Sequence, residues 1–429
     1  MPHAAWKKCV RHLNPQRLRE TLMEMVDIPS PTGREREMAR YLAGRLGRAG
    51  FRTGLQEVGE GRPNAVGTLP GAGDGRNLLI TGHMDTSYDG DEDYLSGEGF
   101  KAKAVHRNGW IWGLGANNMK SGLASALVAV EAVAKESVPL RGDLTYAGVV
   151  GEIEKAPVEE FQGVSFAGYG TGSRYLVLHG VTSDCVILAE PTDLCVSNAN
   201  LGVLWAKITA RGTVSHSVFT KHPGIQNAIR AIHRIQAAIE KWAPSYESRH
   251  ECMGQHPNVT IASVRGGLPW RLSRNPIEAS LYLDIRTVPG QPPEDVKREL
   301  RAVLRKAAEE GGEPEAELGF YIYDPGTLLD PKHPLVDAML RAHKLALGKA
   351  SPLTIRRPAA DSTHFNHYEL PCVCYGPGGR MHPGAKKKGL MHAVGEHVSV
   401  ENLVAAAKVY VAAILDICGK PARRSPRTS

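Results

Sequence analysis

The stretch from Leu78 to Thr86 constrains the fold of this chain more than any other part of the sequence. It opens with an apolar run, Leu78-Leu79-Ile80, and continues into Gly82-His83-Met84-Asp85. A short apolar run ending at a glycine is typical of a buried strand, so His83 is expected at the rim of a sheet, where open α/β folds bind ligands. Asp85 follows two residues later and could orient the ring of His83 as a metal ligand.

Two more predicted strands end in carboxylates. The strand Leu144 to Val150 is followed by Glu152, and the strand Cys185 to Ala189 is followed by Glu190. By itself, a histidine or glutamate at a strand end is most often structural, as a cap or a surface charge. Strands of one sheet that end in His83, Glu152 and Glu190 would converge on a single rim, and this convergence favours a functional site.

Composition limits the classes of protein that need to be considered. A chain of 429 residues usually forms two domains, and the net charge of +7 comes largely from short basic runs near the ends. Without an aromatic-interleaved basic patch, we expect no nucleic-acid partner. Seven scattered cysteines indicate reduced thiols and a cytoplasmic location, while the late apolar stretch 403–417 is too short and too charged to enter a membrane.

Residues 200–318 show a pattern of their own. The predicted order of elements is strand, helix, strand, strand, helix, strand, which is the ferredoxin-like arrangement. We therefore predict an α/β protein in which residues 1–199 form the first part of a catalytic domain, residues 200–318 an inserted α+β domain, and residues 319–429 the second part of the catalytic domain.

Several motifs together resemble the co-catalytic zinc metallopeptidase superfamily of aminoacylase, carboxypeptidase G and succinyl-diaminopimelate desuccinylase. The motifs are Ile28-Pro29-Ser30-Pro31-Thr32-Gly33, Gly82 to Thr86, the Gly113 to Lys120 loop, Glu190-Pro191-Thr192, Gly212 to His216, Asp284-Ile285-Arg286, and His392 with Glu396. The resemblance implies a three-layer α/β/α catalytic domain with an inserted ferredoxin-like lid and dimerisation domain. It also implies two metal ions, a glutamate that activates water, and a homodimer.

Residue by residue, the resemblance implies the following roles. His83, Glu190 and His392 match metal ligands, and Asp85 matches the residue that orients His83. Glu152 matches the general base, which takes a proton from water whose pKa a Lewis-acid metal has lowered. His216 matches a histidine that the partner subunit offers to the developing oxyanion, although a surface role on the lid is the alternative.

Two positions depart from the family pattern. Asn118 stands where the family has the aspartate that bridges two metal ions, and Ile153 stands where it has a second glutamate. An amide is a poor bridge between cations and isoleucine is no ligand, so the second metal site lacks its anionic donors. Glu154 could compensate, because residues two apart on an extended backbone face the same side. We expect about one divalent transition-metal ion per chain, namely zinc, manganese or cobalt.

Other matched positions belong to the substrate side. Arg286 matches an arginine that grips a substrate carboxylate, and a structural ion pair is its alternative. Asp361 and Gly378, the latter in the loop 376–379, match substrate-side elements.

The sequence as a whole predicts a metal-dependent hydrolase that cleaves a C–N bond of a peptide, an N-acyl amino acid or another carboxylate-bearing amide. Two alternatives remain open at this point. One is an aminohydrolase that removes an amino group from an aromatic acid, and the other is a degenerate binding protein that kept the fold.

Overall fold

The computed structural model describes residues 2–153, 155–158, 162–163, 166–385 and 391–421. The chain divides into two compact units. The larger unit comprises Met1–Asn198, Leu329–Thr354 and Ala360–Ser429, and the smaller unit comprises Ala199–Leu328 and Ile355–Ala359.

A mixed sheet forms the centre of the larger unit, with strand order β1-β2-β6-β3-β7-β15-β8-β13 and with β14 also paired to β8. The last two residues of β8, all of β13 and the last two residues of β14 belong to the smaller unit. The central strands β6, β3, β7 and β15 run parallel, so their carboxyl ends share one edge. The strands are β1 Arg52–Gly59, β2 Arg62–Leu69, β3 Leu78–His83, β6 Leu144–Val149, β7 Cys185–Leu188, β8 Val196–Asn200, β13 Thr327–Leu328, β14 Leu353–Arg356 and β15 Cys372–Cys374.

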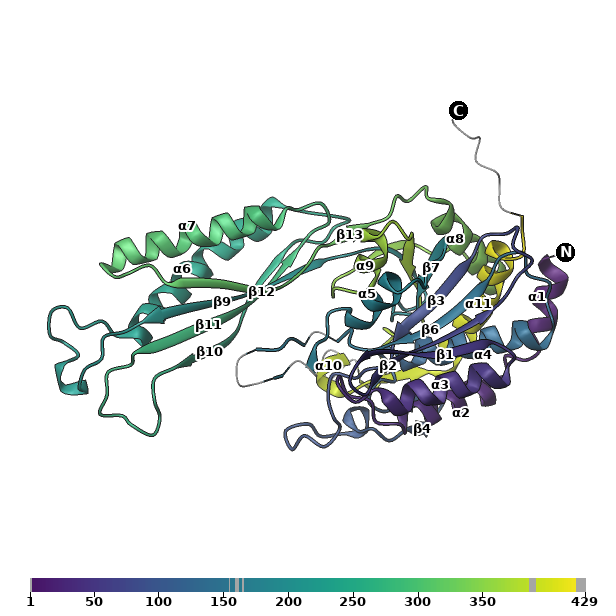
Figure 1. Cartoon of the computed structure of the whole chain (residues 1–429), viewed down its shortest axis with the longest axis horizontal. Helices are drawn as coiled ribbons and strands as arrows, with labels where there is room; N and C mark the ends of the chain where they lie inside the picture. The colour runs from purple at the N-terminus through teal and green to yellow at the C-terminus, as the bar shows by residue number, and fades with distance from the viewer. Residues whose placement is uncertain (1, 154, 159–161, 164–165, 386–390, 422–429) are drawn as a thin grey trace, which may run out of the picture. The chain divides into compact units, whose positions relative to one another are not determined.

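Helices cover both faces of this sheet (Figure 1). Leu78 and Ile80 of β3 enter the main core beneath α2, α3, α4, α8 and α11, whereas Leu79 between them enters a second core with Leu176 of α5 and Phe365 of α9. Alternating burial on two faces is expected of a central parallel strand. The helices are α1 Pro2–Val10, α2 Pro15–Val26, α3 Arg36–Arg48, α4 Lys120–Lys135, α5 Thr171–Leu178, α8 Pro334–Leu347, α9 Ser362–His367, α10 Met391–Val394 and α11 Val400–Ile417.

A small antiparallel sheet, β16-β5-β4, also belongs to the larger unit. Its strands are β4 Val105–Arg107, β5 Trp110–Trp112 and β16 His397–Ser399. The sheet joins the segment before α4 to the segment before α11, since β16 pairs with β5.

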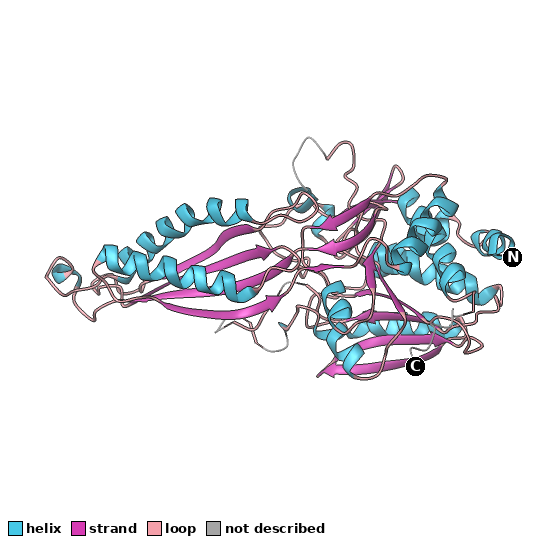
Figure 2. Cartoon of the chain, turned by 90° about the horizontal axis from the view of Figure 1, so that it is seen from above, coloured by secondary structure: helices cyan, strands magenta, loops and turns pink. Residues whose placement is uncertain are grey.

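The smaller unit is a four-stranded antiparallel sheet of order β10-β11-β9-β12, with α6 and α7 along one face (Figure 2). The chain order is β9 Gly202–Arg211, α6 Ala228–Arg249, β10 Asn258–Gly266, β11 Glu278–Thr287, α7 Pro293–Gly311 and β12 Glu317–Asp324. Chain order and strand order together are those of a ferredoxin-like domain.

The predicted fold class is confirmed, since an α/β/α unit carries an inserted α+β unit. The predicted apolar strand occurs as β3, which extends through His83 itself, one residue beyond Gly82. Within the described residues, no helix combines the length and the apolar character needed to cross a membrane.

Candidate metal-dependent active site

Three side chains meet at the carboxyl edge of the parallel strands. His83 is the last residue of β3, Glu152 follows the end of β6, and Glu190 follows the end of β7. One ligand atom from each lies within 4.8 Å of the others, and all three residues are buried. Because β3 hydrogen-bonds to both β6 and β7, the sheet itself brings these three chain segments together.

The imidazole of His83 has a distinct contact on each ring nitrogen. Nε2 lies 3.4 Å from Glu152 Oε2 and 3.4 Å from Asn118 Oδ1. Nδ1 lies 2.9 Å from the main-chain oxygen of Asp85, so Nδ1 carries the proton that is donated there. Nε2 faces Glu152 and Asn118, and in a neutral imidazole it is the nitrogen that would bind a metal ion.

Asp85 does more than orient the histidine ring. Its carboxylate stands 3.4 Å from His83 Nδ1, farther than its main-chain oxygen, so the carbonyl provides the closer contact. The carboxylate accepts hydrogen bonds from the main-chain N–H groups of Glu152 and Ile153, both at 3.1 Å, and from the Thr32 hydroxyl at 2.8 Å. Asp85 therefore fixes the loop that carries Glu152 relative to the end of β3.

Asn118 is held by its backbone. The carboxylate of Glu396 accepts hydrogen bonds from the main-chain N–H groups of Asn117, at 3.0 Å, and Asn118, at 2.8 Å. The same loop begins α4, whose first turn packs closely on the end of β7. A Cβ at Gly122 would lie 1.7 Å from the carbonyl oxygen of Ala189, so only glycine permits this approach.

Gly378 has a comparable packing role. A Cβ there would meet the carbonyl oxygen of Asn117 at 2.5 Å, and the neighbouring Gly379 N–H donates to the Asn117 side chain at 2.7 Å. The loop 376–379 thus supports the loop of Asn118, and the absence of a side chain at Gly378 allows the two backbones to touch.

Asp361, before α9, is buried near this cluster. Its carboxylate accepts a hydrogen bond from the Ser173 hydroxyl at 2.5 Å. Burial raises the pKa of Asp361 to about 7, and the charge of Glu190 acts in the same direction. Asp361 is therefore part of the electrostatic environment of the three converging side chains.

The cluster has the charge and donors of a cation site. Burial raises the pKa of Glu152 well above its usual range, and the charges of Glu190 and Asp361 add to this against the lowering effect of His83. Burial alone would lower the pKa of His83, but Glu152 and Asp85 raise it well above its usual range. One imidazole nitrogen and several carboxylate oxygens, buried together, fit a divalent transition-metal ion, which would relieve the repulsion between the carboxylates.

The other predicted site residues are distributed as follows. His392 lies in α10, but its side chain falls outside the part of the chain that the structure describes, and Glu154 lies outside it entirely. His216 and Arg286 belong to the smaller unit. The guanidinium of Arg286 donates to both carboxylate oxygens of Asp284, at 2.7 and 2.8 Å, which is the structural ion pair expected as its alternative role.

Sequence reasoning did not assign some residues that support the site. Lys120 is buried and donates to the main-chain oxygen of Ile28 at 2.9 Å, which ties α4 to the loop containing Thr32. Lys120 and Ile28 both stand in motifs that carry the family resemblance, so the sequence did contain a signal that could have pointed to them. Ser173, the partner of Asp361, stands in no motif, and only the fold places it there.

Several known proteins are similar to this chain over nearly its whole length. The N-formyl-4-amino-5-aminomethyl-2-methylpyrimidine deformylase of Bacillus subtilis (strain 168) is 25% identical over 419 residues, covering 91% of this chain and 92% of the deformylase. The acetylornithine deacetylase of Myxococcus xanthus is 27% identical over 414 residues, covering 94% and 98%. A solved tripeptidase of Staphylococcus aureus matches the fold with a TM-score of 0.74 at 19% identity, covering 95% and 99%.

The buried histidine–carboxylate cluster and these relatives together define a metal-dependent hydrolase of C–N bonds. The family model described as Peptidase family M20/M25/M40 matches residues 79–416, so the chain belongs to this family. The family resemblance and the predicted hydrolase activity are thereby confirmed. The alternative of a degenerate, non-enzymatic binding protein is not supported.

Proposed function

We propose that this enzyme removes an acyl group from a small carboxylate-bearing amide. The observation that carries the proposal is the convergence of His83, Glu152 and Glu190 within 4.8 Å in a buried site. Two similar enzymes are named for removing a formyl and an acetyl group from nitrogen, which supports an acyl-amide substrate over a long peptide.

His83 and Glu190 are the ligands we assign to the ion, with Asn118 as a neutral oxygen donor and His392 as a further histidine. A bound divalent ion supplies Lewis-acid activation of water and of the scissile carbonyl. Asp85 keeps His83 in the tautomer that presents Nε2. Glu152, held by the hydrogen bond from its own N–H to Asp85, accepts the proton of the attacking water and passes it to the departing nitrogen.

The proposed metal content is about one zinc, manganese or cobalt ion per chain. Asn118 and Ile153 occupy the two positions that would supply anionic ligands for a second ion, and Ile153 is a buried apolar side chain. A second cation nearby would meet repulsion without a bridging carboxylate to offset it. Glu154 stays a proposed supplementary ligand.

We propose substrate contacts from Asp361 and from the loop at Gly378, since both lie beside the ligand-bearing loops of the larger unit. Arg286 stays a proposed carboxylate-binding residue, but its bidentate pair with Asp284 supports the structural role instead. The second candidate is an aminohydrolase that acts on an aromatic amine. Asn118 and Ile153 favour it, because a reaction that needs one ion does not require carboxylate ligands at these two positions.

The test is metal analysis of the purified enzyme combined with a substrate panel. The panel contains N-formyl, N-acetyl and N-succinyl amines, dipeptides, and aromatic amino acids with a ring amino group. Turnover of an N-acyl compound with release of the free carboxylate supports the first function. Release of ammonia from a ring amine, with no amide turned over, would replace it by the second.

We also propose that residues 200–318, the inserted domain, act as a lid and dimerisation domain. Support comes from β10, an edge strand, because edge strands readily pair with a copy of themselves. The same unit exposes large apolar side chains, among them Phe219, Trp270 and Leu272. His216 lies three residues before Phe219. A two-fold dimer formed through this unit would therefore place His216 close to the subunit interface.

Subunit complementation tests the dimer and the role of His216 together. His216→Ala and Glu152→Gln should each be inactive as pure proteins. After mixing and subunit exchange, half of the dimers are mixed and each holds one intact site, so about a quarter of wild-type activity should return. A monomer in sedimentation experiments, or no rescue despite proven exchange, would contradict the proposal.

The cytoplasm is the proposed location. All seven cysteines are free thiols, and a reducing compartment maintains that state.

A further inference from the structure

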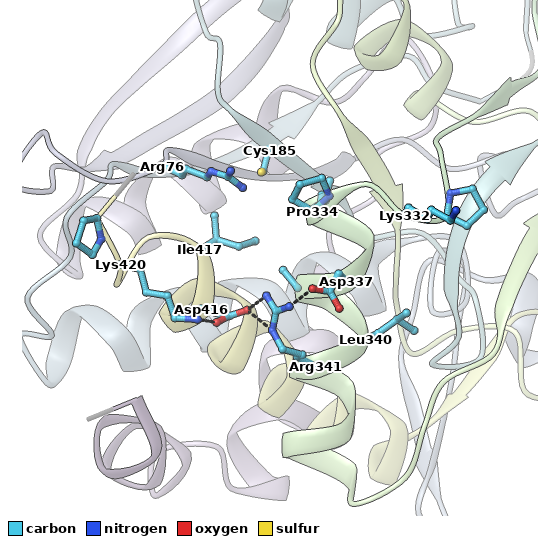
Figure 3. A pocket seen from close by; sticks show the side chains of 14 residues that line it. Arg76, Cys185, Lys332, Pro334, Asp337, Leu340, Arg341, Asp416, Ile417 and Lys420 are labelled. Carbon is cyan, nitrogen blue, oxygen red and sulfur yellow. Dashed lines mark hydrogen bonds and ion pairs between the residues drawn. The ribbon is translucent and has the colours of Figure 1, made fainter. Parts of the chain in front are cut away.

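A pocket lies at the edge of the sheet opposite to the hydrolytic site. It has a volume of about 610 Å³ and is bounded by the start of β7, the first turns of α8 and the end of α11 (Figure 3). Cys185, the first residue of β7, lines it, whereas Glu190 follows the opposite end of that strand. At about 3.3 Å per residue, the two positions are separated by roughly 16 Å, so this pocket is distinct from the hydrolytic site.

Part of the charge around the pocket is already neutralised. Arg341 of α8 donates to Asp416 of α11 at 2.6 and 3.1 Å and is also paired with Asp337. Lys420 pairs with Asp416 as well. Two arginine or lysine side chains thus balance the two aspartates of the lining, and Figure 3 shows this network on one side of the pocket.

Two cationic side chains that line the pocket take no part in this network. The side chains of Arg76 and Lys332 have no hydrogen-bond or ion-pair partner among the residues that the structure describes. Neighbouring carboxylates are bound to main-chain N–H groups instead, Asp330 to that of Lys332 and Asp184 to that of Asn77.

Arg76 lies across Ile417 from the Arg341 network (Figure 3). Its charge reaches the first turn of α8. Burial and then Arg76 lower the pKa of His333, the residue that caps this helix, while Asp330 acts in the opposite direction. The residues that line the pocket therefore carry four positive and two negative charges, a net of about two positive charges.

The remaining walls are apolar. Pro334, Leu335, Ala338, Leu340 and Ile417 line the space beside the charged groups. A volume of this size is typical of small-molecule sites and exceeds what a bare inorganic ion requires. Cations beside an apolar wall match a ligand that has a charged head and an apolar body.

We propose that this pocket binds a small organic dianion, a phosphate ester or a dicarboxylate, with Arg76 and Lys332 as its cationic partners. The apolar body of the ligand lies against α8 and Ile417. The site is separate from the hydrolytic centre and does not depend on the proposed substrate.

Isothermal titration calorimetry on the metal-loaded enzyme tests the proposal. The probes are phenyl phosphate and phenylsuccinate, with inorganic phosphate as a head group without a body and benzyl alcohol as a body without charge. The pocket variant is Arg76→Gln with Lys332→Gln. Its matched control is Arg48→Gln with Lys135→Gln, which removes the same charge from exposed positions elsewhere on the larger unit.

At least one aromatic dianion should bind the wild type and the control with equal affinity and the pocket variant at least about tenfold more weakly, with benzyl alcohol silent. Binding of phenyl phosphate alone identifies a phosphate ester, and binding of phenylsuccinate alone identifies a dicarboxylate. If the pocket variant melts early, exposed Lys332→Gln by itself should weaken binding about threefold. The proposal is overturned if neither dianion binds, or if the pocket variants bind as the control does.

Discussion

The two edges of the parallel sheet differ in sign of charge and in burial. At the carboxyl edge, His83, Glu152 and Glu190 are buried, and Asp85 is hydrogen-bonded to the ring of His83 and to the main-chain N–H of Glu152. At the amino edge, Arg76 and Lys332 are half-buried or exposed around an open pocket. Buried carboxylates are stable only beside positive charge, so the carboxyl edge should depend strongly on a bound cation. At the amino edge, water solvates Arg76 and Lys332, so this edge should not depend on a bound ion.

Removal of the metal should have the largest effect. Dialysis against a chelator should reduce amide turnover by more than about a hundredfold, because the Lewis acid is lost and the buried carboxylates repel one another. Added zinc, manganese or cobalt should restore turnover. Anion binding at the amino edge should be unchanged. Full turnover by protein that is metal-free by elemental analysis would remove the ion from the reaction.

Glu152→Gln should lower turnover by about a hundredfold to ten-thousandfold while metal content stays near that of the wild type. The amide retains the volume of the side chain but cannot accept a proton. Kinetics with elemental analysis check this, and Glu60→Gln, an exposed position, serves as the control. Near-normal turnover would exclude Glu152 as the base and direct attention to Glu154.

Asp85→Asn should weaken metal affinity by about tenfold to a hundredfold. An asparagine offers one acceptor oxygen where the carboxylate serves the N–H groups of Glu152 and Ile153 with separate oxygens. Competition with a chromophoric chelator measures the affinity, and exposed Asp93→Asn is the matched control. Unchanged affinity would mean that the main-chain oxygen of Asp85 alone suffices to orient His83.

The double change Asn118→Asp with Ile153→Glu should raise metal content from about one ion to about two per chain. It would restore the two carboxylates that the carboxyl edge lacks for a second ion. Inductively coupled plasma measurement provides the count, with each single change as a control. Two ions in the unaltered enzyme would refute the one-ion proposal and implicate Glu154.

The sequence alone determined much of this protein. An apolar run that ends at a glycine predicted the strand before His83, because a central strand of an α/β sheet is buried on both faces. The strand and helix order of the insert predicted the ferredoxin-like unit, since chain connections limit the available topologies. Residue types at strand ends predicted the convergence of His83, Glu152 and Glu190, because parallel strands share one edge.

Only the tertiary structure decided how these residues are held. Three contacts join positions far apart in the chain. Asp85 accepts hydrogen bonds from the loop of Glu152, Glu396 accepts one from the N–H of Asn118, and Asp361 accepts one from Ser173. The amino-edge pocket depends on α8, α11 and the start of β7 meeting in space, and no motif marks it. Local sequence patterns report the burial of single elements, whereas such pairings depend on how elements pack, which a linear pattern does not contain.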